Sequence, residues 1–181
     1  MKLIILDRDG VINVDSESYV KHPDEWHPIE GSLEAIARLH RAGWRVVVAS
    51  NQSGLARGYF DGAALTAMHQ KCRELLAPLG GAIDAFFVCP HGPDDDCDCR
   101  KPLPGLFLEI GHRFDTPLTG VPAVGDSLRD LQASSAAGCT PWLVETGNGL
   151  KTRQSPDLPP GTQFAHNLAE VADRLLSEGS N

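Results

Sequence analysis

The sequence lacks any hydrophobic run long enough to cross a membrane, because none of its apolar stretches approaches the roughly 20 residues required. Lys2 and a short apolar stretch open the chain, but acidic residues follow at once, which indicates a strand and not a signal peptide. No internal repeat, low-complexity tract or linker divides the 181 residues. We therefore expect one domain over residues 1–181, a monomer located in the cytoplasm without a membrane partner.

Positive charge is also scarce, since the chain has 16 Lys and Arg against 24 Asp and Glu, a net charge of −8. An acidic chain binds nucleic acids and anionic membranes poorly, so neither is an expected partner. A phosphorylated substrate would need positive charge supplied locally, by a metal ion and a few Lys or Arg side chains.

The cysteines do not form the even-numbered framework of a disulfide-stabilised secreted protein. There are five, and three of them lie within eleven residues. Clustered cysteines in a chain of this kind more often bind a metal ion.

The first chemically informative stretch is residues 3–13. Four apolar residues, Leu3–Leu6, predict a buried strand of a parallel sheet, and the run stops at Asp7 and Asp9. Ligands of open α/β sheets bind beyond the carboxyl ends of the strands, and side chains two residues apart face the same crevice. Taken alone, this pattern fits an ordinary turn equally well.

Apolar strands and helical patterns then alternate along the chain. Strands are predicted at 44–49, 83–88, 121–124 and 140–144. Helices are predicted to begin at Ser32, Asp61, Pro104, Leu131 and Asn167, with Ser32, Asp61 and Asn167 as N-caps. The order predicts right-handed crossovers and an α/β fold: one Rossmann-like, mostly parallel sheet with helices on both faces. No segment is long enough for a large cap domain.

A zinc-binding loop is predicted at residues 89–102. Cys89, His91, Cys97 and Cys99 supply three thiolates and one imidazole, a closed tetrahedral set for a structural Zn²⁺. Its expected task is to fix the loop that presents Arg100 and Lys101. The alternatives are chance clustering of surface thiols and an iron–sulfur site, which the histidine disfavours.

Four segments together resemble the haloacid dehalogenase-like (HAD) phosphatases. Residues 7–13, Asp-Arg-Asp-Gly-Val-Ile-Asn, resemble the first motif and are most similar to the D-glycero-D-manno-heptose 1,7-bisphosphate phosphatases. The histidinol-phosphate phosphatases are a related group. Residues 50–53, Ser-Asn-Gln-Ser, resemble the second motif, Lys101 the third, and Asp126 the fourth.

The resemblance implies a mechanism and a magnesium site. Asp7 would attack phosphorus and form an aspartyl-phosphate, while Asp9 would act first as an acid and then as a base. Asp7, Asp126 and the backbone carbonyl of Asp9 would bind Mg²⁺. Ser50 and Lys101 would contact the transferring phosphoryl group.

The resemblance also implies the residues that contact a small phosphorylated sugar. The expected substrate-binding residues are Asp15, Tyr19, Ser50, Asn51, Gln52, Ser53, Arg100 and Lys101. The heptose group commonly has a lysine where this chain has Ser127, and Asp130 occupies the position of a further acid.

The function that this resemblance implies is Mg²⁺-dependent removal of the C7 phosphate from D-glycero-D-manno-heptose 1,7-bisphosphate, in nucleotide-heptose synthesis for lipopolysaccharide or related glycans. Two alternatives stay open on the sequence alone. One is a histidinol-phosphate phosphatase, which shares the carboxylates and the zinc loop. The other is a non-catalytic, zinc-stabilised binding module.

Overall fold

A computed structural model describes residues 1–178. In these residues all sheet pairings are parallel, and the strand order is β3-β2-β1-β4-β5-β6. The strands are β1 (Leu3–Leu6), β2 (Arg45–Asn51), β3 (Ala85–Cys89), β4 (Pro122–Gly125), β5 (Thr140–Val144) and β6 (Gln163–Ala165). The helices are α1 (Ser32–Arg41), α2 (Gly62–Leu76), α3 (Gly105–Arg113), α4 (Leu128–Ala136), α5 (Gly149–Thr152) and α6 (Leu168–Glu178).

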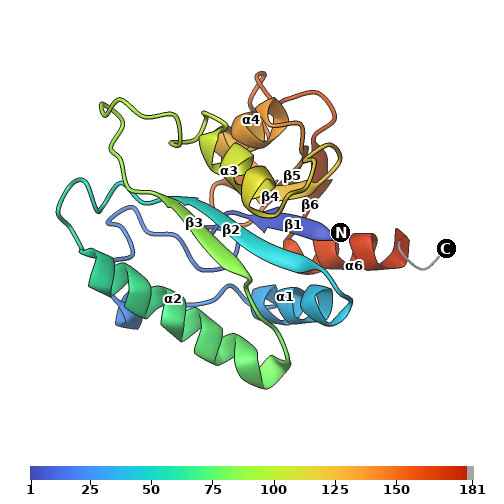
Figure 1. Ribbon diagram of the computed structural model, residues 1–181, viewed down its shortest axis with the longest axis horizontal. Coiled ribbons are helices and arrows are strands. Elements are labelled where there is room, and N and C mark those ends of the chain that lie inside the picture. The colour runs from blue at the N-terminus through green and yellow to red at the C-terminus, as the bar shows by residue number, and fades with distance from the viewer. Residues whose placement is uncertain (179–181) are drawn as a thin grey trace.

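Helices cover both faces of the sheet, as the sequence predicts. Figure 1 shows α1, α2 and α6 on one side and α3 with α4 on the other. The side chains of β1 alternate between the two layers: Ile4 and Leu6 belong to the core under α1, α2 and α6, and Leu3 and Ile5 to the core under α3 and α4. Because both faces are buried, the strand sequence is continuously apolar.

The order of the strands places a crevice beside β1. The connections run outward in one direction from β1 through β2 to β3, and in the other direction from β4 through β5 to β6. The Asp7 amide donates to the Val124 carbonyl at 2.9 Å, which keeps the ends of β1 and β4 together beyond the last paired residues. Ligands of such sheets bind where the direction of winding reverses, here after β1 and β4.

Two of the predicted helix caps are confirmed and one is wrong. The Asp61 carboxylate accepts from the Ala64 amide at 2.8 Å, and the Asn167 side chain accepts from the Glu170 amide at 3.0 Å. Ser32 is instead the first residue of α1, and Gly31, at φ 82°, is its N-cap. The Ser32 hydroxyl donates to the Val11 carbonyl at 2.7 Å, so it ties α1 to the segment after β1.

Strand β6 and the short helix α5 were not predicted. Strand β6 has three residues and lies at the sheet edge, with Gln163 and Phe164 exposed, so its sequence has no apolar run. Helix α5 has four residues, which is too short for a helical period to appear. No helix within the described residues is long and apolar enough to span a membrane.

The cap of α2 gives a stability prediction. Asp61→Ala leaves an N-terminal amide of the helix without its acceptor, and we expect it to lower the free energy of unfolding by about 1 kcal/mol. Asp61→Ser, which keeps a side-chain oxygen, should lose less than half of that. Urea unfolding followed by circular dichroism checks this, and equal midpoints for Asp61→Ala and the parent would contradict it.

Candidate active site

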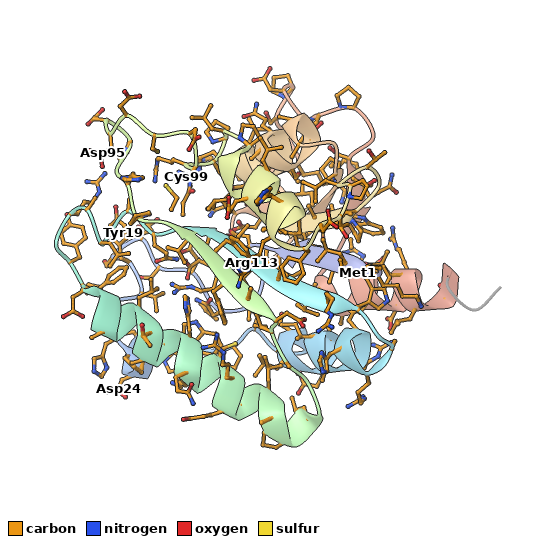
Figure 2. All side chains as sticks on the ribbon, viewed as in Figure 1. Met1, Tyr19, Asp24, Asp95, Cys99 and Arg113 are labelled. Atoms are coloured by element: carbon orange, nitrogen blue, oxygen red, sulfur yellow. The ribbon has the colours of Figure 1, made fainter. Side chains whose placement is uncertain are left out.

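The carboxyl ends of β1, β2 and β4 surround a cavity of about 370 Å³. The cavity is lined by most of the residues singled out in the sequence: Asp7, Asp9, Asp15, Tyr19, Asn51, Gln52, Ser53, Arg100, Lys101 and Asp126. Figure 2 shows Tyr19 and Cys99 at this end of the sheet, where β2 and β3 finish. The topology therefore assembles residues that lie more than 100 positions apart in the chain.

Lys101 is the central cation of this cavity, and its side chain is only 3% exposed. Its ammonium group contacts Asp7 Oδ1 at 2.9 Å, Asp130 Oδ1 at 2.6 Å and the Ala49 carbonyl oxygen at 2.9 Å. Burial opposes the charge of Lys101, but Asp130 and Asp7 outweigh it and raise the pKa of Lys101 above its ordinary value. Lys101 therefore stays protonated beside Asp7.

Carboxylates outnumber cations in the same place. Oxygen atoms of Asp7, Asp126 and Asp130 all lie within 4.8 Å of one another. Burial, followed by the charge of Asp130, raises the pKa of Asp7 to about 7 and that of Asp126 to about 8. When all three carboxylates are ionised, they exceed the single Lys101 ammonium by two negative charges, so a divalent cation fits this donor set.

Two glycines make room for the Asp126 carboxylate. A Cβ atom on Gly10, at φ 86°, would lie 2.1 Å from Asp126 Oδ2, and a Cβ atom on Gly147 would lie equally close. The Asn148 amide donates to the same oxygen at 2.8 Å. Asp126 is thus enclosed by backbone from two loops, which fixes its orientation.

Asp9 is held by donors from three side chains. Arg8 contacts both carboxylate oxygens, Asn13 Nδ2 donates to Oδ1 at 2.9 Å, and Gln52 Nε2 donates to Oδ2 at 2.8 Å. Burial disfavours the ionised form, but the Arg8 guanidinium and these hydrogen bonds prevail and lower the pKa of Asp9. Asp9 and Asp7 are therefore two neighbouring carboxyl groups with opposite pKa shifts.

The residues of the second motif have distinct contacts. Asn51 pairs with the backbone of Lys101: its Oδ1 accepts from the Lys101 amide at 3.0 Å and its Nδ2 donates to the Lys101 carbonyl at 3.1 Å. Ser50 is buried, is not among the cavity-lining residues, and accepts from Gln52 at 2.8 Å. Asn51 thus positions the lysine, and phosphoryl binding by Ser50 stays a prediction.

Sequence reasoning did not assign several residues of the cavity wall to the site. Arg57, Arg129 and Asn148 line it although they lie in loops or at the start of a helix, where no pattern distinguishes them from solvated residues. Asp130, whose role the sequence left open, accepts from the Ser127 amide at 3.0 Å and from its hydroxyl at 2.7 Å. Asp130 therefore caps α4 while it binds Lys101.

The predicted zinc ligands come together in part. The Sγ atoms of Cys89, Cys97 and Cys99 lie within 4.8 Å of one another, which suits shared coordination of one ion. The ring of His91 does not join this group in the described residues, whereas its backbone carbonyl accepts from Arg100 Nη1 at 3.2 Å. All five cysteines are free thiols.

Comparison with known proteins agrees with this geometry. The family model "Polynucleotide kinase 3 phosphatase" matches residues 2–127, and a HAD-hydrolase-like model matches residues 98–171. A D-glycero-beta-D-manno-heptose-1,7-bisphosphate 7-phosphatase from Bordetella bronchiseptica is 63% identical over 98% of this chain and 99% of its own. The enzyme of that name from Pseudomonas aeruginosa is 56% identical over 96% and 97%. This chain belongs to the same family of HAD phosphatases.

Solved structures of the family have the same architecture. The D,D-heptose 1,7-bisphosphate phosphatase of B. bronchiseptica, complexed with magnesium and phosphate, superimposes with a TM-score of 0.97 at 63% identity over 98% of this chain and 99% of its own. The corresponding enzyme from Burkholderia thailandensis gives a TM-score of 0.77 at 49% identity, over 98% and 99%. The predicted HAD fold is therefore confirmed, and this chain is a phosphatase.

The close packing of Gly10 against Asp126 gives a prediction with a matched control. Gly10→Ala and Gly43→Ala both force a side chain onto a residue at positive φ, 86° and 84°, which costs about 1–2 kcal/mol of stability in each. Only at Gly10 does the new methyl group meet Asp126; at Gly43 nothing lies within 4 Å.

We therefore expect similar losses of thermal stability in the two variants but very different phosphatase activities. Gly10→Ala should lower kcat/KM by about 100-fold, because displacing a group at the reacting centre by about 1 Å has effects of that size. Gly43→Ala should retain parent activity. Equal activities in the two variants would contradict the assigned role of Asp126.

Proposed function

We propose that this phosphatase removes the C7 phosphate of D-glycero-β-D-manno-heptose 1,7-bisphosphate. The named relatives support the substrate, since identity to them reaches 63% over almost the whole chain. The observation that carries the chemistry is the contact of the buried Lys101 ammonium with Asp7, in a cavity that Asp9 and Asp126 also line. A non-catalytic binding module would not require this combination.

In the first half-reaction, a carboxylate oxygen of Asp7 bonds to the phosphorus of the C7 phosphate as the bond to the sugar oxygen breaks. The lowered pKa of Asp9 means that it must take up a proton with the substrate before it can give one to that leaving oxygen, and the sugar then departs as an alcohol. Lys101 neutralises part of the charge on the transferring phosphoryl oxygens. The product on the protein is an aspartyl-phosphate on Asp7.

In the second half-reaction, a water molecule attacks the same phosphorus and Asp9 takes its proton. The bond between phosphorus and Asp7 then breaks, which releases inorganic phosphate and restores both carboxyl groups to their starting states. One residue acts as acid and then as base, which fits the position of Asp9 two residues from the nucleophile.

Mg²⁺ would be held by Asp7 and Asp126, with the Asp9 carbonyl as the third protein ligand. Its chemistry would be to neutralise charge that accumulates on the phosphoryl oxygens. Asp7 and Asp130 share the single Lys101 ammonium, so the cluster of Asp7, Asp126 and Asp130 has an excess of two negative charges when all three carboxylates are ionised, which supports a divalent ion.

The cationic rim of the cavity favours a bisphosphate over histidinol phosphate. Arg57, Arg100 and Arg129 line the cavity along with the deeper Lys101. Arginine side chains suit bidentate contact with a second phosphate group. Histidinol phosphate carries one phosphate and an ammonium group, and the ammonium would meet like charge at this rim.

A substrate panel tests the proposal. With Mg²⁺, kcat/KM should be at least about 100-fold higher for the β-heptose bisphosphate than for histidinol phosphate, because two bidentate arginine contacts supply a few kcal/mol of discrimination. Asp7→Asn should abolish turnover of every substrate while thermal unfolding remains cooperative. A preference for histidinol phosphate would refute the substrate, and turnover by Asp7→Asn would refute the mechanism.

We also propose that Cys89, His91, Cys97 and Cys99 bind a structural Zn²⁺. The three thiols already converge, and the half-buried His91 is the proposed fourth ligand of a closed site. The site would fix residues 89–102, in which the His91 carbonyl accepts from Arg100 and the chain leads directly into Lys101.

Metal analysis distinguishes this site from chance clustering. Cys99→Ser and His91→Ala should each lower the zinc content from about one ion per chain to a small fraction, since four ligands are needed. Both variants should lose activity several-fold through the displaced Arg100. Cys139→Ala, which removes a buried thiol outside the cluster, is the control and should keep its zinc. Full zinc in His91→Ala would remove histidine from the ligand set.

The cellular setting of the reaction stays a prediction. A role in nucleotide-heptose synthesis, a cytoplasmic location and a monomeric state are the expectations that accompany this substrate.

A further inference from the structure

Arg8 lies between the two catalytic aspartates and is one of the most deeply buried side chains in the described part of the chain, at 1% exposure. Its guanidinium group lies close enough to α2 for its charge to act on two buried side chains of that helix. The charge favours a lower pKa for both His69 and Cys72. Placing a guanidinium group in such a core is energetically costly unless it is paired and hydrogen-bonded. An arginine buried there calls for a specific role.

All recorded side-chain hydrogen bonds of Arg8 go to Asp9. Nε lies 3.2 Å from Oδ1, and Nη2 lies 2.8 Å from Oδ1 and 3.1 Å from Oδ2. Among the described residues, Nη1 of Arg8 has no partner, and neither Nε nor Nη2 is recorded as donating to a backbone carbonyl. The geometry of Arg8 is thus directed at one carboxylate.

The other groups around Arg8 do not compete for this role. His69 stacks on Phe86 with ring centroids 3.9 Å apart. Its pKa is lowered to about 3, by burial first and then by Arg8, so it is a neutral neighbour. Asp9 is the ion-pair partner that the structure records for Arg8 within residues 1–178.

Asp9 nevertheless keeps an open side. Its side chain is 21% exposed and lines the cavity. Arg8, Asn13 and Gln52 donate hydrogen bonds to its carboxylate. We propose that Arg8 is a positioning residue, which fixes the Asp9 carboxylate in the orientation from which it exchanges protons with the leaving oxygen and with water. This inference rests on the acid–base role of Asp9 in the proposed function.

The leaving group of the substrate distinguishes positioning from a merely structural role. A sugar alkoxide needs a proton to depart, whereas p-nitrophenolate leaves without one, and kcat/KM reports the steps up to that departure. Arg8→Met should therefore lower kcat/KM for the heptose bisphosphate by about 100-fold, the size of a general-acid contribution. For p-nitrophenyl phosphate the loss should be less than about fivefold, because no proton is transferred in that step.

A matched control is available in Lys71, another cation that faces this core. Its ammonium group donates to the carbonyls of Pro23 and Trp26 at 2.7 and 2.8 Å, so it joins α2 to the segment at residues 23–26. Lys71→Met should lower the melting temperature and leave the ratio of the two kcat/KM values unchanged. Arg8→Lys, which keeps the charge without the planar fork, should fall between Arg8→Met and the parent.

A double-mutant cycle with Asp9→Asn completes the test. If Arg8 acts through Asp9, Arg8→Met should lower kcat/KM by less than about threefold in the Asp9→Asn background, since the interaction is already absent. Full additivity, or equal losses for both leaving groups, would overturn the inference while leaving the proposed function intact. Parent activity in Asp9→Asn alone would refute the acid–base assignment and the inference with it. If Arg8→Met does not fold, Arg8→Lys is carried through the same comparisons.

Discussion

The contact between the Lys101 ammonium and the carboxylates of Asp7 and Asp130 is the interaction on which the site depends. It joins the loop before α3 to the end of β1 and to the first turn of α4. Because the lysine is buried, its charge is only weakly screened, and removing Lys101 would leave Asp7 and Asp130 without the cation that they share. The same pairing keeps Asp7 beside a fixed cation, where a phosphoryl group must arrive.

Three neighbouring parts of the structure help to position Lys101 for this contact. Asn51 hydrogen-bonds both backbone groups of Lys101, so the end of β2 sets the height of the lysine above the sheet. The proposed zinc loop, residues 89–102, contains Lys101 and would limit where its backbone can lie. Asp130 holds the lysine from α4 and caps that helix through Ser127, so the stability of the helix and the position of the cation are connected.

Much of the fold could be predicted from the sequence, because buried parallel strands are apolar runs that end abruptly at polar residues. Strands β1 to β5 and the carboxylates Asp7, Asp9 and Asp126 have this signature. The edge strand β6 and the short helix α5 lack it. Ser32 was misassigned as a cap because serine is a good N-cap in general, whereas here its hydroxyl is engaged by the Val11 carbonyl. Arg57 and Arg129 are exposed, and only the fold shows that they face the cavity.

Arg8 shows a limit of pattern reading of another kind. Its position in the first motif was plain, yet a charged residue after a strand is usually solvated, and nothing in the sequence indicates that it turns into the core. Once it is buried, the charge must be balanced, and Asp9 is the recorded counterion. Asp9 and Asp7 then differ in a way that suits their proposed roles: Arg8 is the cation that pairs with Asp9, whereas Asp7 shares Lys101 with Asp130 and faces the cavity. Two carboxylates two residues apart thereby acquire separate surroundings, as the proposed division into nucleophile and acid requires.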